Sequence, residues 1–351
     1  MKILFNIYHL FGKFILKMLT VFFSMNQKYF YNNEYKKVER HKLLLLVLNT
    51  YINEITPIFT QKNRNYIETI ENENLIVYLS RNNYSIKFVF KDEESIVYPP
   101  NYFGQDYPVP KKIEHPDIYI AKLEKANIIG SSSLIVHNNI GLINNSSYDN
   151  NTKVDFHSNS SVLFSNSNKI SHYFVDKSKP AIDKGIMLNG LFSFNYYHWI
   201  IEYLPKLLII DNTNDYDTFP LLVDRDIFYI SQLYEALELL NLKKRKIIPL
   251  DSSSKYFINK LVIPSSVNYL ISNIKKGYEY SSFDCILRRD TLLDLRNHFL
   301  KRLEIQPKLE KKIFISRKNT SRRCFNESEI FEIFKKYGFE TVYPEKLSFI
   351  E

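Results

Sequence analysis

Residues 195–207 form the stretch Asn-Tyr-Tyr-His-Trp-Ile-Ile-Glu-Tyr-Leu-Pro-Lys-Leu, where an alternation of helices and short apolar strands begins. We predict a helix near residues 196–210, a strand at 221–223 and a helix at 231–240. The same alternation continues with a strand at 260–263, a helix near 283–303, a strand at 313–315, a helix at 327–337 and a strand at 340–343. Such alternation indicates crossover connections, so we expect an α/β fold with a parallel sheet.

The part of the chain before residue 195 has a different character. Between residues 118 and 175, short apolar runs alternate with Asn- and Ser-rich clusters, which predicts a β-rich region. Residues 75–78 and 86–90 are predicted to form two short strands. Prolines are frequent between residues 98 and 116, which indicates a loop or linker. The Leu-rich run 43–48 predicts a buried helix.

Composition limits the classes of protein to which the chain can belong. Its 351 residues suffice for roughly two domains, and 45% hydrophobic with 24% charged residues is a globular composition. Two cysteines, Cys285 and Cys324, exclude a disulfide framework or a four-Cys zinc site. Lys and Arg exceed Asp and Glu by 47 − 38 = 9, which favours an anionic partner. Because the basic residues are scattered and carry no nucleic-acid motif, a phosphorylated small molecule is favoured over nucleic acid.

Residues 1–30 are apolar and aromatic, but Gly12, Lys13 and Lys17 interrupt them. No uncharged run reaches the ~18 residues that a spanning helix needs. Two alternatives remain: a helix lying in a membrane interface with its lysines towards anionic head groups, or a helix packed on the protein. We expect a cytoplasmic protein, at the inner face of a membrane in the first alternative.

His198 and Glu202 are the strongest candidates for catalysis. In a helix they are four residues apart and share one face. A carboxylate one turn away fixes the imidazole tautomer and raises its basicity, which suits a general base acting on a sugar hydroxyl. Tyr197 and Trp199 flank the histidine, where they could stack on a sugar ring. The alternative is a buried helix in which the histidine and the glutamate serve only as hydrogen-bond partners of each other, without a role in catalysis.

A second candidate segment covers residues 313–326, where a buried strand leads into a basic loop and then a helix. Arg317 and Arg322 could make bidentate contacts to a diphosphate, and the helix N-terminus adds favourable potential. Asn326 and Glu329 resemble a capping box with Asn as the cap. The glycines of a P-loop or a dinucleotide fingerprint are absent. The alternative is a solvated basic loop.

The segment Asp215-Tyr216-Asp217 matches the two-carboxylate pattern that holds a divalent metal in some sugar transferases. Because so short a match arises easily by chance, a solvated loop is the favoured interpretation.

Taken together, these segments resemble glycosyltransferase family 61, which includes capsular polysaccharide biosynthesis proteins and plant xylan-modifying transferases. Residues 195–207 resemble the family's signature. The other matching segments follow in the family's order: 261–264, 315–318 with Arg322, and 331–347. The resemblance covers roughly residues 115 to 351, and two motifs in the right order make it fairly specific.

The resemblance implies a GT-B fold, in which two Rossmann-like domains face a cleft. It also implies inverting, metal-independent transfer from a nucleotide-sugar to a glycan or polysaccharide acceptor, with the nucleotide-sugar as co-substrate and no cofactor. His198 and Glu202 fall on the family's His-Trp-x-x-Glu positions in the acceptor-side domain. Arg317 and Arg322 fall on the arginines of the donor-side domain. The residues expected to bind substrate are Asn195, Tyr197, Trp199, Ser316, Arg317 and Arg322, with His198 and Glu202 as the catalytic pair.

Family members continue past the Ser-Phe-x-Glu stretch, here residues 348–351, into a Gly-rich loop. The resemblance therefore implies a C-terminally truncated second domain. The expected organisation is an apolar helix at 1–30, an α+β region with a Pro-rich linker at 31–117, the acceptor-side domain at 118–280, and the start of the donor-side domain at 281–351. We expect hexosyl or pentosyl transfer in surface polysaccharide or glycan assembly. The alternative is a non-catalytic remnant that acts as a glycan-binding or scaffold module.

Overall fold

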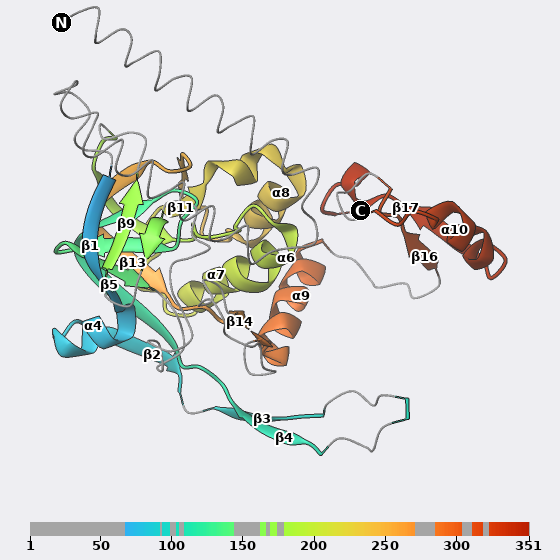
Figure 1. Ribbon diagram of the computed structural model, residues 1–351, viewed down its shortest axis with the longest axis horizontal. Coiled ribbons are helices and arrows are strands. Elements are labelled where there is room, and N and C mark those ends of the chain that lie inside the picture. The colour runs from blue at the N-terminus through green and yellow to red at the C-terminus, as the bar shows by residue number, and fades with distance from the viewer. Residues whose placement is uncertain are drawn as a thin grey trace, which may run out of the picture.

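One large mixed sheet forms the centre of the protein (Figure 1). The computed structural model describes residues 67–91, 93–98, 103–104, 109–143, 162–165, 169–173, 179–270, 285–303, 311–318 and 323–350. In pairing order the strands are β12 (Ile247–Leu250), β11 (Leu221–Asp224), β10 (Ile182–Met187), β13 (Lys255–Pro264), β5 (Ile118–Ile129), β6 (Leu134–His137), β7 (Ile140–Ile143), β1 (Ile67–Asn74), β9 (Lys169–Tyr173) and β8 (Val162–Ser165), with β2 (Ile86–Phe90) paired to β5. The predicted segments 1–30 and 43–48 lie outside the described residues.

The parallel part of the sheet follows from the predicted alternation. Strands β12, β11, β10 and β13 pair in parallel. Their connections contain α6 (Tyr196–His198), a π-helical turn (Trp199–Tyr203), α7 (Leu204–Asp211), a 3-10 turn (Arg225–Tyr229) and α8 (Ser231–Leu240). The predicted strand at 221–223 and helix at 231–240 are therefore confirmed.

The β-rich region is not a separate layer, because β13 pairs with β5 in antiparallel orientation over most of its length. This pairing joins the β-rich and the α/β parts of the chain into one sheet. The prediction of a mixed α/β fold is confirmed at this level. The arrangement as two Rossmann-like domains stays a prediction.

Both faces of the sheet are buried where its two parts meet. In β10, Ile186 packs into the cluster that contains the buried residues of α7 and α8. The next residue, Met187, packs on the opposite face with α4 (Leu75–Arg81). Neighbouring strand residues point to opposite faces, so apolar residues in succession are required here. This explains why the central strands are apolar runs rather than alternating patterns.

The predicted strand at residues 75–78 is wrong, because this segment is the helix α4. The Asn74 side chain accepts hydrogen bonds from the backbone N–H groups of Ile76 and Val77, at 3.0 and 3.2 Å. This is an N-cap, which favours a helix start. Leu75 and Leu79, four residues apart, are both fully buried, so the segment has a helical rather than an extended apolar face.

Residues 98–116, predicted to be a linker, contain part of a hairpin. Strand β3 (Glu94–Val97) pairs with β4 (Lys111–Glu114) in antiparallel orientation, and the hairpin projects from the body of the protein (Figure 1). Lys112 and Glu94 form a cross-strand ion pair. The prediction of a loop fits the described residues 98, 103–104 and 109–110, which lie in no strand or helix, and it is wrong for β4.

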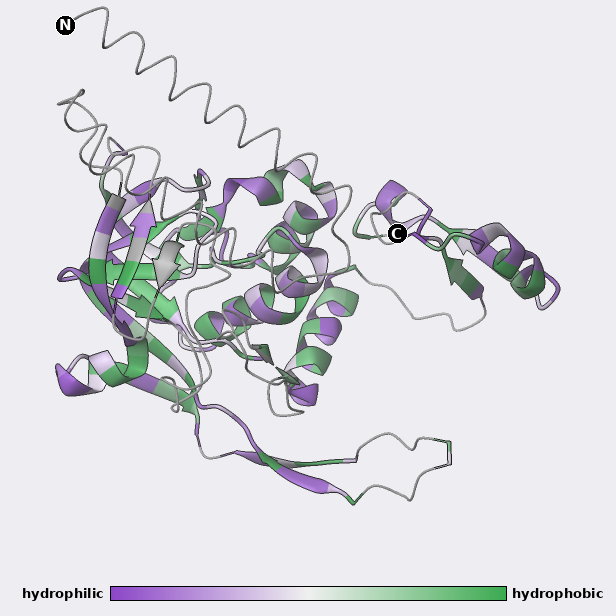
Figure 2. Ribbon diagram, in the orientation of Figure 1, coloured by the Kyte–Doolittle hydropathy of each residue, from purple (hydrophilic) through white to green (hydrophobic). Residues whose placement is uncertain are grey.

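The C-terminal part contains β16 (Lys312–Ile315), α10 (Glu327–Lys335) and β17 (Phe339–Val342), with the two strands parallel. The predicted strand–helix–strand order is confirmed. Phe314 of β16 packs on one apolar stripe of α10, visible in Figure 2, with ring centroids 5.4 Å from those of both Phe331 and Phe334.

The last described residues return to the main body. Phe349 lies against Phe299 of α9 (Arg289–Leu303), with ring centroids 4.8 Å apart. Gln232 of α8 donates to the Leu347 carbonyl. Three further short elements complete the described part: η5 (Pro344–Lys346) and the paired strands β14 (Tyr269–Leu270) and β15 (Cys285–Ile286). No helix in these ranges combines the length and the apolar character needed to cross a membrane.

Candidate active site

The predicted catalytic helix begins at the carboxyl edge of the parallel strands. The chain leaves β10 at Met187 and reaches α6 after a short loop. In open α/β sheets ligands bind at this edge. The Asn195 side chain accepts hydrogen bonds from the backbone N–H groups of Tyr197 at 3.0 Å and of His198 at 3.5 Å. Asn195, expected to bind substrate, therefore serves as the N-cap that starts this helix.

The helix continues through a π-helical turn, because Leu204 donates its backbone N–H to the carbonyl of Trp199, five residues earlier. Pro205 has no N–H to offer the carbonyl of Ile201. The Asn268 side chain donates to that carbonyl instead, at 2.6 Å. Pro205 therefore changes the pitch of the helix rather than ending it. Such π-turns are frequent at functional sites.

The predicted pairing of His198 and Glu202 is present. The Nδ1 atom of His198 is hydrogen-bonded to Oε1 of Glu202, and the two side chains are 27% and 14% exposed. A carboxylate at Nδ1 selects the tautomer with the proton on Nδ1, which leaves Nε2 as the basic atom. The rings of Phe192 and Tyr197 flank the imidazole, with centroids 5.4 and 5.6 Å from its centroid. The pair can therefore act as a general base beside exposed aromatic rings.

Trp199 requires a correction. Its side chain is fully buried, its indole N–H donates to the Leu233 carbonyl at 3.0 Å, and its ring stacks on that of Tyr203. No face of the indole is exposed to a sugar, so we assign Trp199 to the core between α7 and α8. Tyr197, by contrast, is 47% exposed.

A buried carboxylate that the sequence did not reveal fixes the loop before α6. Asp224, at the end of β11, accepts hydrogen bonds from Ser131 N at 2.6 Å, Gly190 N at 3.0 Å and Ser193 Oγ at 2.5 Å. Burial raises the pKa of Asp224 to about 6. Gly190 is required, because a Cβ there would lie 2.5 Å from the hydroxyl of Tyr203. The only sequence signal for Asp224 was its position after an apolar strand.

We expect Asp224→Asn to lower the free energy of unfolding by about 2 kcal/mol, because an amide cannot accept all three hydrogen bonds. The pKa of Asp224 is raised in the folded state, so its stabilising contribution is complete below about pH 4 and is lost as the pH rises through about 6. The cost of the substitution should therefore be larger at pH 4.5 than at pH 7. Urea unfolding at both pH values measures it.

The matched control is Asp226→Asn, since Asp226 lies two residues further on and accepts a long hydrogen bond of 3.5 Å from Ser131 Oγ. Its charge makes only the smallest of the contributions to the pKa of Asp224. We expect a change within about 0.5 kcal/mol at either pH. An equal cost of Asp224→Asn at pH 4.5 and pH 7 would contradict the assignment of a raised pKa to this carboxyl group.

The predicted anion-binding segment is built around a carboxylate. Ser316 is buried and its hydroxyl donates to Glu327 Oε1, while the backbone N–H of Arg317 donates to Glu327 Oε2 at 2.7 Å. The Arg317 side chain is exposed. The expected capping box is wrong, because the Asn326 side chain makes no capping hydrogen bond. Glu327 in the first turn bonds to the end of β16 instead. Arg322 lies outside the described residues.

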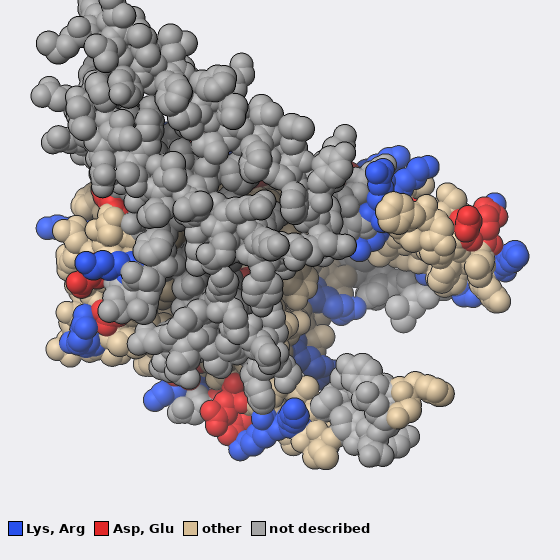
Figure 3. Space-filling model, viewed as in Figure 1, with Lys and Arg blue, Asp and Glu red and all other residues tan. Residues whose placement is uncertain are grey.

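His198 and Arg317 belong to different parts of the fold. His198 lies on the helix over the main sheet, whereas Arg317 follows β16 in the C-terminal strand–helix–strand unit, and Figure 1 shows α6 and β16 apart. That they face a common cleft stays a prediction. On the face shown in Figure 3, the described Lys and Arg side chains are spread over several regions rather than gathered in one patch.

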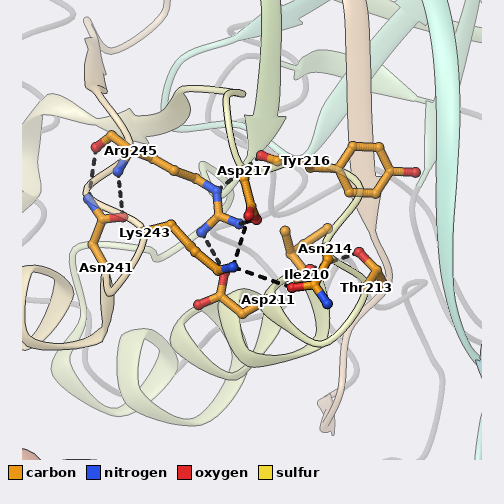
Figure 4. A network of polar contacts seen from close by, with 9 residues as sticks. All are labelled: Ile210, Asp211, Thr213, Asn214, Tyr216, Asp217, Asn241, Lys243 and Arg245. Carbon is orange, nitrogen blue, oxygen red and sulfur yellow. Dashed lines mark hydrogen bonds and ion pairs between the residues drawn. The ribbon is translucent and has the colours of Figure 1, made fainter.

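The segment 215–217 takes part in ion pairs rather than presenting two carboxylates together. Asp215 pairs with Lys87 at 2.7 Å. Asp217 pairs with Lys243 at 2.8 Å and with Arg245 at 3.3 Å, in the network of Figure 4. Each carboxylate is thus already neutralised by a cation of its own. The favoured interpretation, a solvated loop, fits the exposed side chains of Asp215 and Asp217 but not that of Tyr216 between them, which is buried.

The chain is similar to a known protein family. The protein-family model described as Glycosyltransferase 61 matches residues 196–351. The match begins at the first residue of α6 and includes the His198–Glu202 pair and the Ser316–Arg317 segment. No curated protein matches the chain.

Proposed function

We propose that this chain, whose residues 196–351 belong to glycosyltransferase family 61, transfers a sugar from a nucleotide-sugar to a glycan acceptor. The observation that carries the proposal is the hydrogen-bonded His198–Glu202 pair, part-exposed between the rings of Phe192 and Tyr197. It lies at the edge of a parallel sheet where ligands bind, within the part of the chain that matches the family.

In the proposed reaction Nε2 of His198 removes the proton from an acceptor hydroxyl. The oxygen attacks the anomeric carbon of the donor sugar, the bond from that carbon to the diphosphate oxygen breaks, and the configuration is inverted. The imidazole becomes positively charged, and Glu202 at Nδ1 stabilises that charge. Phe192 and Tyr197 expose aromatic surface against which the apolar face of a sugar ring can pack.

The departing diphosphate must be neutralised, and in this proposal the arginines do so without a metal ion. Arg317 and Arg322 offer guanidinium groups with a geometry that suits phosphate oxygens. Ser316 Oγ and the Arg317 backbone N–H are also suitable donors, but Glu327 accepts from both. Donor binding at these two atoms therefore requires the Glu327 carboxylate to move away.

The same proposal extends to the setting of the enzyme. We place it in the cytoplasm, in surface polysaccharide or glycan assembly, with a GT-B arrangement of two domains. The aromatic segment 1–30 carries Lys13 and Lys17, a composition suited to a peripheral contact with anionic lipid.

The test is turnover of a panel of nucleoside-diphosphate sugars by the full chain, with a mixture of oligosaccharide acceptors and detection of the released nucleotide. We expect turnover of at least one donor, and Arg317→Ala should raise the KM for that donor about tenfold, the loss of one charge-assisted contact. The matched control is Lys318→Ala, which removes a neighbouring exposed cation and should leave KM within about twofold.

A second candidate is a glycan-binding module without transferase activity, and the occupation of Ser316 and Arg317 N by Glu327 favours it. Calorimetry separates the two proposals. A module of this kind binds oligosaccharide but neither binds nor turns over any nucleoside-diphosphate sugar, whereas the transferase binds both. Activity that a chelator abolishes would contradict the metal-independent mechanism.

A further inference from the structure

Phe192, in the loop before α6, has a backbone conformation that large side chains rarely adopt. Its φ is 63°, in the left-handed region that favours glycine. The other described non-glycine residues with a positive φ are all asparagine, serine or lysine, so Phe192 is the only apolar residue among them. A bulky side chain in this region costs free energy. Such a conformation persists only where the surrounding structure imposes it.

The loop around Phe192 is held by hydrogen bonds on both sides. Before it, the backbone N–H of Gly190 donates to the buried carboxylate of Asp224 at 3.0 Å. After it, the Ser193 hydroxyl donates to the same carboxylate oxygen at 2.5 Å. The backbone N–H of Asn195 donates to the Phe192 carbonyl at 2.8 Å. These contacts fix the backbone at Phe192 and therefore the direction in which its ring leaves the loop.

The ring of Phe192 lies beside the proposed catalytic base. Its centroid is 5.4 Å from that of the His198 imidazole, and the two ring planes are 31° apart. Tyr197, by contrast, meets the imidazole nearly edge-on, at 84°. The separation of 5.4 Å is comparable to the size of one sugar ring. A hydroxyl of a sugar that packs on the Phe192 ring can therefore reach the imidazole.

Packing in the core does not account for the phenylalanine, because the residue is 38% exposed. A glycine at this position would adopt the same backbone conformation without strain, but it would offer no flat apolar surface next to His198. Strained conformations are concentrated at active sites and ligand-binding sites. The strain and the exposed ring together indicate that Phe192 contacts a ligand.

We propose that Phe192 determines acceptor specificity: its ring selects acceptors whose reacting hydroxyl belongs to a pyranose with an apolar face of C–H groups, and it brings that hydroxyl to Nε2 of His198. This inference rests on the proposed function of the His198–Glu202 pair. The apolar face of a pyranose packs on an aromatic ring, which buries C–H groups of the sugar. A hydroxyl on a serine or threonine side chain has no such face, so the acceptor class is a sugar and not a peptide.

The test compares Phe192→Leu, which keeps apolar volume without a flat face, with Phe192→Tyr, which keeps the ring. The acceptors are the β-linked tetrasaccharides of glucose, xylose and galactose, and a peptide that contains serine and threonine. We expect Phe192→Leu to raise the KM for the best tetrasaccharide about tenfold, the loss of one stacking contact. Its kcat should stay within about threefold, since the base is unchanged. Phe192→Tyr should keep the wild-type KM within about twofold. Transfer to the peptide alone would overturn the proposal.

The matched control is Phe194→Leu. Phe194 lies in the same loop and is 45% exposed, but it is not among the described residues with a positive φ. In the described part of the chain, the ring contacts of His198 are with Phe192 and Tyr197. Phe194→Leu should therefore keep the wild-type KM within about twofold. An equal rise of KM in both Leu variants would show a general effect of exposed aromatic surface and would overturn the proposal.

A second pair of variants tests the backbone conformation. Phe192→Gly and Phe192→Ala both remove the ring, so the difference between their melting temperatures reports on φ. We expect the Gly variant to melt about 2 °C above the Ala variant. At Phe194 the order should be reversed, because glycine there only adds flexibility to the unfolded chain. The same order at both positions would overturn the proposal, since the loop would then not impose the position of the Phe192 ring.

Calorimetry with the same tetrasaccharides separates this inference from the proposed function. The wild-type chain should bind at least one of them, and Phe192→Leu should raise its Kd about tenfold, whereas Phe194→Leu should not. If binding shows this dependence but no donor is turned over, only the proposed function is contradicted. If turnover is present and Phe192→Leu leaves both KM and Kd unchanged, only this inference is overturned.

Discussion

Replacing His198 with alanine should lower the rate of sugar transfer at least about 100-fold, because a general base contributes 10²- to 10⁴-fold to such reactions. The side chain is part-exposed, and its hydrogen bond to Glu202 is the only one the structure gives the imidazole among the described residues. The melting temperature should therefore change little. The measurement is initial rate at saturating donor, with thermal unfolding monitored on the same samples.

Glu202→Gln is the companion variant, since it keeps the shape of the side chain but not its charge. It should reduce kcat less than His198→Ala does, because the base remains and only its orientation and charge stabilisation are weakened. Tyr197→Phe, which retains the exposed ring, serves as the control and should stay within a few-fold of the wild type. Wild-type turnover in His198→Ala would remove the proposed mechanism.

Replacing Arg245 with methionine should lower the free energy of unfolding by about 3 kcal/mol, the cost of removing one partner from the largely buried ion pair of Arg245 with Asp211. The Arg245 side chain is fully buried; its guanidinium group donates to Asp211, to Asp217 at 3.3 Å and to the carbonyl of Tyr216 at 3.1 Å (Figure 4). These contacts connect the end of α7 to the turn before β12. Urea unfolding of the variant and the wild type measures the loss.

The control for this prediction lies in the same network. Lys243 pairs with Asp217 at 2.8 Å, but both side chains are more than one third exposed. Lys243→Met should change the free energy of unfolding by less than about 1 kcal/mol, as for other exposed pairs. Equal losses of free energy of unfolding in the two variants would contradict the prediction, because they would show that the burial of Arg245 does not make its ion pairs more stabilising than those of Lys243.

The sequence predicted the secondary structure well wherever one local signal dominated. The helix at 231–240 and the strand at 221–223 lie within a residue of the predicted positions. Helix α9 begins at Arg289 rather than near 283, and β15 lies in between. The run at 75–78 was predicted as a strand, because a short apolar run alone does not distinguish the two conformations. The cap at Asn74 was the signal that could have decided it.

The candidate site was predictable to the extent that it depends on spacing along one helix. His198 and Glu202 are bonded because four residues span one turn. The burial of Trp199 against Leu233 depends on how α7 packs on α8, which spacing does not reveal. Asp224 binds Ser131 and Gly190, residues 93 and 34 positions away, and no local pattern connects them.

The antiparallel pairing of β5 with β13 has a consequence for biosynthesis. Leu123 pairs with Leu261, so a ribosome must add a further 261 − 123 = 138 residues before this partner exists. At about 5–20 residues per second that interval is on the order of ten seconds. During this interval the edge of β5 that later pairs with β13 has no partner strand, and unpaired strand edges promote aggregation. The nascent chain should therefore depend on chaperones most strongly between the synthesis of β5 and that of β13.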